Sequence, residues 1–180
     1  MDPANPPAPD FSDPLGLLRA CHGRIQHFAG MARQLADYPL APPEERVRQA
    51  ATRIRRYFDQ AAPLHHADEE RDLLPLLAPH AGGHGPLRVL VDGLQAEHAE
   101  LDQRWGELQP LLVELADGRA VAPAAYAAAA EAFEAAMSDH VARENAHLLP
   151  AAEAHLTAPD LQALGAAMAR RRGVGQNKDG

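Results

Sequence analysis

Apolar residues recur at intervals of three and four along four segments of the chain, and this spacing is the main guide to its fold. The first segment, residues 14–37, places Leu18, Ile25, Ala29 and Ala32 on one face. A second begins near residue 44, a third spans about 87–116, and a fourth begins near residue 123. Because this spacing aligns side chains along one side of an α-helix, the pattern predicts four amphipathic helices that share a core.

Proline and glycine mark the connections between these segments. They occur in residues 39–43, in the glycine-rich stretch 79–86 and around Gly118, and Pro63 predicts a kink within the second helix. A shorter periodic segment covers residues 159–171. We therefore expect an all-α antiparallel four-helix bundle with a short C-terminal fifth helix, in a domain spanning residues 12–172. Residues 1–11 and 173–180 are expected to be flexible tails.

Composition narrows the class of protein. Hydrophobic residues make up 46% of the 180 residues, and alanine and leucine dominate, which favours one helical domain. A net charge of −8 argues against nucleic-acid binding, and no signal peptide or apolar run of about 20 residues indicates export or a membrane span. The single cysteine, Cys21, suits a reducing compartment, so a cytoplasmic protein is expected. Cys21 itself is expected to fill space in the core and not to share a metal with His22.

The candidate chemistry lies where polar residues interrupt the apolar faces. The phrase H-x-x-x-E-x-x-x-L-L-P occurs twice, beginning at His65 and at His140. Each copy follows a lone histidine on the preceding helix, His22 in the first half and His98 in the second. Equivalent residues are offset by 75 or 76 positions. This repeat predicts two related halves arranged about a pseudo-two-fold axis.

The repeated residue types point to a pair of bound cations. In each phrase the histidine and the glutamate, Glu69 or Glu144, are four residues apart and therefore share one helical face. A buried carboxylate is costly without a partner, and no lysine or arginine lies on these faces to supply one. Two glutamates on opposed helices can bridge two cations, and imidazole with carboxylate suits iron or manganese better than structural zinc. One such histidine is usually an ordinary core residue, but six residues in a repeated order are hard to attribute to chance.

This order of ligands over four helices resembles the hemerythrin-like (HHE cation-binding) family across about residues 14–155. The resemblance implies a non-haem di-iron bundle with two oxo- or hydroxo-bridged iron ions that bind O2 or NO. It further implies that His22, His65, His98 and His140 are terminal ligands and that Glu69 and Glu144 are the bridging carboxylates.

The sequence departs from the oxygen-carrying members, which use five histidines and two carboxylates. We favour His66 as the additional ligand because Glu70 repeats the four-residue spacing one position on. His147, one turn beyond Glu144, and solvent are the alternatives. The remaining histidines, which are His27, His80, His84 and His155, are not expected to bind metal.

Two acidic residues beside the first phrase, Asp68 and Asp72, are expected on a solvated helix face. The alternative is that they accept hydrogen bonds from ligand imidazoles and so fix their orientation.

The functional expectation is a di-iron protein that binds O2 or NO for sensing, storage or protection against oxidative and nitrosative stress. An iron-handling role, in iron–sulfur repair or storage, and a purely structural metal site are the alternatives. The sequence leaves open whether the protein is an enzyme with weak oxidase or peroxidase activity, and it indicates no protein partner.

Overall fold

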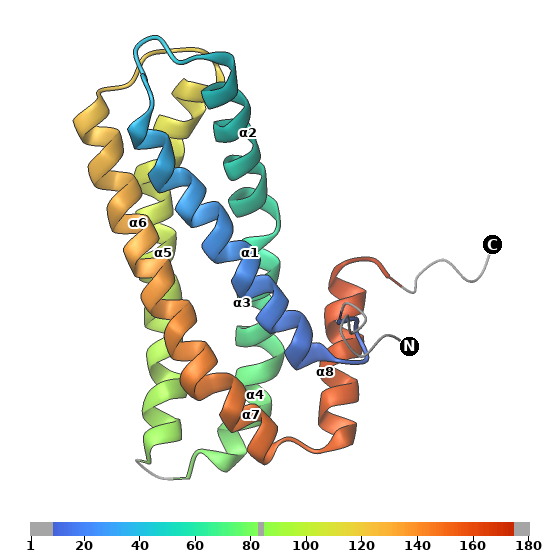
Figure 1. The fold of residues 1–180 in the computed structure, drawn as a ribbon. Coiled ribbons are helices and arrows are strands. Elements are labelled where there is room, and N and C mark those ends of the chain that lie inside the picture. Colours follow the sequence, from blue (N-terminus) through green and yellow to red (C-terminus); the bar gives the residue numbers. More distant parts are fainter. Residues whose placement is uncertain (1–8, 83–84, 175–180) are drawn as a thin grey trace, which may run out of the picture.

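A computed structural model describes residues 9–82 and 85–174, and it confirms an all-α bundle with a fifth helix (Figure 1). The described residues form no β-strand. Of the expected tails, residues 1–8 and 175–180 lie outside the described part of the chain, as does His84 in the glycine-rich loop.

The first rod of the bundle is α1 (Pro14–Gln34), which continues into the short 3₁₀ turn Leu35–Asp37. Its start is fixed by Asp13, whose carboxylate accepts a hydrogen bond from the Gly16 amide at 3.0 Å. Pro14 occupies the first turn, where the missing N–H costs nothing. The predicted boundaries of this helix are confirmed.

The second rod is built from four consecutive helical pieces. They are α2 (Glu45–Gln60), α3 (Ala62–Asp68), the π-helical turn η2 (Glu69–Leu73) and α4 (Leu74–Leu77), which ends in the 3₁₀ turn Ala78–His80. The regular helix is interrupted at Ala61, two residues before Pro63, because proline in a helix interior removes a hydrogen bond and crowds the preceding turn. The predicted irregularity near Pro63 is therefore present.

The second half of the chain repeats this design. The long helix α5 (Pro86–Ala116) is the third rod, and the fourth comprises α6 (Pro123–Arg143), the π-helical turn η4 (Glu144–Leu148) and α7 (Leu149–His155). Figure 1 shows the four rods side by side, with the α1–α2 and α5–α6 connections at the same end. These connections are joined by a hydrogen bond from the Val121 amide to the Leu40 carbonyl at 3.2 Å.

The fifth helix, α8 (Ala158–Arg171), lies beside the start of α1 and against α3 (Figure 1). Thr157 and Asp160 form a reciprocal capping box at its N-terminus. The carbonyl of Phe11 approaches Gly165 so closely that a side chain there would collide with it. Phe11, which was assigned to the flexible tail, is thus partly buried against the base of the bundle.

Two hydrophobic clusters fill the bundle, one above and one below its middle. The larger one packs around Phe58, Tyr126 and Phe133, and the smaller one around Leu18, Leu73 and Leu148. The layer between the clusters contains the histidines and glutamates of the repeated phrases. No helix of the described chain is long and apolar enough to cross a membrane.

Candidate metal centre

Six side chains from four rods meet between the two hydrophobic clusters. His22 comes from α1, His65 from α3, His98 from α5 and His140 from α6, while the two π-turns η2 and η4 supply the carboxylates. Each of the six is at most 2% exposed. The structure therefore brings together the four histidines and two glutamates that the sequence repeat singled out.

The two carboxylates are shared between two pairs of histidines. Glu69 directs Oε1 to within 3.4 Å of His65 Nε2 and Oε2 to within 3.5 Å of His98 Nε2. Glu144 directs Oε2 to within 3.2 Å of His22 Nε2 and Oε1 to within 3.1 Å of His140 Nε2. Each glutamate thus offers one oxygen to the His22–His65 pair and the other to the His98–His140 pair.

These atoms have no hydrogen-bond partner among the described residues. All four carboxylate oxygens and the four Nε2 atoms are buried and unpartnered, although buried polar atoms are normally satisfied. Two ligand atoms about 2.1 Å from one cation at right angles are about 3 Å apart, close to the separations seen here. The chemistry and the spacing of these donors both fit a pair of cations.

The candidate donors divide into two groups that share Glu69 and Glu144. One is completed by His22 and His65 and the other by His98 and His140, and in each group the donor atoms lie within 4.8 Å of one another. Neither group includes a thiolate. The two groups are related by the pseudo-two-fold axis, and each could hold a cation on its own side of the two carboxylates.

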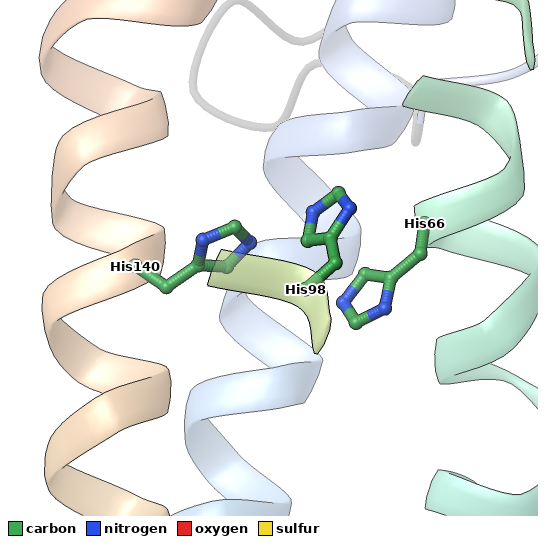
Figure 2. A group of neighbouring side chains, drawn as sticks. All are labelled: His66, His98 and His140. Carbon is green, nitrogen blue, oxygen red and sulfur yellow. The ribbon is translucent and has the colours of Figure 1, made fainter. Parts of the chain in front are cut away.

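His66 forms a third group with the two histidines of the second group, and it breaks the symmetry. Figure 2 shows its ring beside those of His98 and His140, and the three offer nitrogen atoms within 4.8 Å of one another. The rings of His66 and His98 are stacked, with centroids 4.1 Å apart. Burial, together with the nearby imidazoles of His98 and His65, lowers the pKa of His66 to about 3. This imidazole is therefore neutral and can offer a lone pair to a cation.

The other histidines weighed from the sequence do not reach the centre. His147 is exposed on η4, and His27, His80 and His155 are also exposed. Of the two candidates for an additional ligand, the structure brings His66 to the site and leaves His147 at the surface. Glu70, expected beside His66, instead faces His98.

The carboxylates dominate the electrostatics of the metal-free centre. Burial alone would lower the pKa of His22 and of His98, but the adjacent carboxylates of Glu144 and Glu69 outweigh it and raise each pKa to about 10. Burial would raise the pKa of Glu144, but the adjacent imidazoles of His140, His22 and His98 hold that pKa well below its ordinary value. The centre therefore retains anionic carboxylates that are compensated by protons or by cations.

The Nδ1 atoms, on the far side of the imidazole rings, bind groups around the centre. His22 Nδ1 lies 2.7 Å from Asn145 Oδ1, His98 Nδ1 lies 2.7 Å from Glu70 Oε1, and His140 Nδ1 lies 3.1 Å from Glu97 Oε2. Such contacts orient an imidazole and determine which ring nitrogen carries the proton.

Cys21 lies beside the fourth imidazole, that of His65. His65 Nδ1 has no hydrogen bond of regular geometry among the described residues. Burial would lower the pKa of His65, whereas Glu69 and then the Cys21 thiol act to raise it. Cys21 Sγ also accepts a hydrogen bond from Arg24 Nη2 at 3.1 Å. The expectation that Cys21 is only a space-filling residue was therefore incomplete.

The L-L-P ends of the two phrases explain the π-turns that carry the glutamates. Pro75 and Pro150 lack an N–H and would crowd the preceding turn of a regular helix. The amides of Leu74 and Leu149 instead bind the carbonyls of Glu69 and Glu144, five residues earlier. The sequence analysis took these segments as regular helix and missed both wide turns, which recur at functional sites.

The expectation of a solvated face for Asp68 and Asp72 was wrong. Asp68 is fully buried and forms ion pairs with Arg171 and Arg172 of the C-terminal segment, and Asp72 pairs with Arg171. Neither carboxylate forms a hydrogen bond to a candidate ligand histidine. The fifth helix covers this face of the second rod, which a helix considered alone does not reveal.

Comparison with known proteins finds a cation-binding domain over the part of the chain that contains the candidate ligands. The model of the hemerythrin HHE cation binding domain matches residues 13–152, which include all seven candidate ligands and end before α8. A protein from Haemophilus influenzae described as uncharacterized is 33% identical over 106 residues. The aligned region makes up 58% of this chain and 60% of that protein, so the chain spans about three fifths of its relative.

Proposed function

The chain belongs to the hemerythrin HHE cation-binding family, and on that premise we propose that its centre holds two iron ions and binds dioxygen or nitric oxide. The observation that carries the proposal is the sharing of both carboxylates. Glu69 and Glu144 each turn one oxygen toward His22 and His65 and the other toward His98 and His140. Carboxylates placed in this way suit a pair of bridged cations.

The donor types support iron within this proposal. Imidazole nitrogen and carboxylate oxygen, without thiolate, suit iron and manganese and are poorly matched to a structural zinc site. The resemblance of the sequence to di-iron bundles favours iron over manganese. His22, His65, His98, His140 and His66 would be terminal ligands, with the two glutamates as bridges.

The two donor groups differ in the number of histidines that they offer to a cation. The His22–His65 group contains two histidines, whereas His66 lies as a third histidine beside His98 and His140. We propose that a diatomic ligand binds on the side that has two histidines. A bound and reduced iron pair would supply the electrons for reaction with O2 or NO.

Buried apolar side chains on both sides of the centre would exclude water from a bound ligand. Leu18, Leu73 and Leu148 lie in the cluster on one side of the centre, and Ile25 and Met137 in the cluster on the other. All are at most 2% exposed, so they keep bulk water away from the site. A ligand held there is shielded from proton delivery, which suits sensing, storage or protection against oxidative and nitrosative stress. The single free cysteine is consistent with such a role in a reducing cytoplasm.

The test is metal content by mass spectrometry on untagged protein, with optical spectra before and after reduction and on exposure to O2 or NO. We expect about two irons per chain and near-ultraviolet absorption that bleaches on reduction and returns with O2. Two irons that pass readily to a chelator, without a response to O2 or NO, would favour iron handling. Zinc alone, with unfolding on its removal, would indicate a structural site.

A further inference from the structure

The groups that orient the imidazoles follow the same pseudo-two-fold relation as the ligands. Glu70 and Asn145 are equivalent, because each directly follows the glutamate of its own phrase. Each reaches across the bundle to the lone histidine of the other half: Glu70 binds His98 Nδ1 and Asn145 binds His22 Nδ1. The two positions have the same geometry, but one supplies a carboxylate and the other a neutral amide.

A second equivalent pair differs in the same way. Glu97 directly precedes His98 and binds His140 Nδ1, whereas Cys21 directly precedes His22 and lies beside His65. Here too, one position carries a carboxylate and the other a thiol. Both groups also contact a guanidinium, since Cys21 Sγ accepts a hydrogen bond from Arg24 and Glu97 pairs with Arg143.

Both differences fall on the same side of the centre. His98 and His140 have carboxylate partners at Nδ1, while His22 and His65 have an amide and a thiol. A carboxylate that accepts the Nδ1 proton makes the opposite nitrogen a stronger donor, and loss of such a partner commonly costs 10- to 100-fold in metal affinity. His66 adds a further donor to the same side.

We propose that the two cation positions fill in a fixed order, with the His66–His98–His140 position first and more tightly, and the His22–His65 position second and more exchangeably. This inference rests on the proposed pair of cations. Glu70 and Glu97 are positioning residues, since they act through His98 and His140 and do not themselves join the candidate donor groups. The order of filling therefore depends on the residues that bind the Nδ1 atoms as well as on the number of histidines at each position.

The test is anaerobic titration of the metal-free full-length chain with cobalt(II), followed by visible absorption and by competition with a chelator. We expect two successive equivalents whose affinities differ by about 10-fold or more. Equal affinities would overturn the order while leaving the pair intact. Binding of fewer than two equivalents would instead contradict the proposed pair, so the two failures can be told apart.

Variants of the positioning residues identify which cation position corresponds to each equivalent in the titration. Glu70→Gln should weaken the first equivalent by about 10-fold and leave the second unchanged, and Glu97→Gln should act in the same direction. Asn145→Asp should tighten the second equivalent and bring the two steps together, a gain that misfolding cannot produce. Glu100→Gln, at an exposed position on α5, is the matched control and should change neither step. Weakening of only the second equivalent by Glu70→Gln, or no gain from Asn145→Asp, would overturn the proposal.

Discussion

At the scale of single residues, the centre depends on carboxylates that have no compensation from lysine or arginine. Within the described chain, the ion-pair partners of Glu69 and Glu144 are all imidazoles. Removing one carboxylate should therefore remove both the charge and the bridge that hold a cation pair.

We predict that Glu144→Gln lowers bound metal from about two ions per chain to one or fewer, because an amide is a weaker bridge and carries no charge. Metal analysis after desalting measures this directly. Glu131→Gln, at an exposed position on α6 of the same rod, should retain both ions. Two tightly held ions in the Glu144 variant would contradict the bridging role.

Proton competition gives a second prediction at this scale. His22 and His98 have pKa values of about 10 in the metal-free chain, so both carry a proton at pH 7 that a cation must displace. Cobalt(II) affinity, measured with a competing chelator, should therefore rise from pH 6.5 to pH 8.5. An affinity that does not change over this range would show that these imidazoles are not ligands.

The stability of the metal-free chain should respond to pH in the opposite direction. The folded-state pKa values of His22 and His98 lie above the ordinary value of 6.5. Their contribution to the free energy of unfolding is complete below pH 6.5 and is lost as pH rises through about 10. Thermal unfolding between pH 6.5 and pH 10 provides this independent check.

At the scale of secondary structure, the sequence predicted the four rods and their shared polar layer because ligands and apolar residues follow the same helical period. The sequence did not predict the π-turns, because an L-L-P segment is equally typical of a new helix that has proline in its first turn. Their presence depends on the hydrogen bonds of Leu74 and Leu149, which no side-chain pattern reveals.

The sequence analysis also missed contacts that the flanks of one helix make with other helices. Cys21 and Asp68 each lie one residue, or about 100°, from a ligand, which on an isolated helix turns them away from the centre. In the fold, Cys21 meets His65 of the second rod, and Asp68 meets Arg171 and Arg172. Such contacts depend on which element covers each flank of a helix.

The π-turns lead to a prediction for a double variant. Replacing Pro75 and Pro150 with alanine removes the steric reason for the wide turns and allows regular helix. Glu70 and Asn145, both within these turns, would then shift from His98 and His22. We expect cobalt(II) affinity to fall by about 10-fold while the thermal midpoint is maintained or rises. Unchanged affinity would show that the turns do not position these residues.

At the scale of the whole molecule, α8 extends the bundle beyond the region that matches the family. Its end supplies the cationic partners of Asp68, a fully buried carboxylate next to Glu69. Removing the partners of a buried charge is far more costly than removing an exposed ion pair. The fifth helix is therefore expected to stabilise the rod that carries three of the seven candidate ligands.

We predict that replacing Arg171 and Arg172 together with alanine lowers the free energy of unfolding by about 3 kcal/mol, because Asp68 would be left buried and unpaired. Chemical denaturation of the metal-free chain measures this loss. Arg170→Ala, which changes an exposed neighbour, should have almost no effect. Adding Asp68→Asn to the double variant should restore part of the loss, and a failure to do so would place the effect elsewhere.

Because ligands of one half are oriented by residues of the other half, the site can be completed only late in translation. A ribosome releases His22 early, but the residue that orients it, Asn145, emerges only after three of the four rods. A nascent chain that ends before η4 lacks Glu144 and so has only one of the two shared carboxylates. A pair of cations bound as proposed could therefore be completed only after translation of nearly the whole bundle.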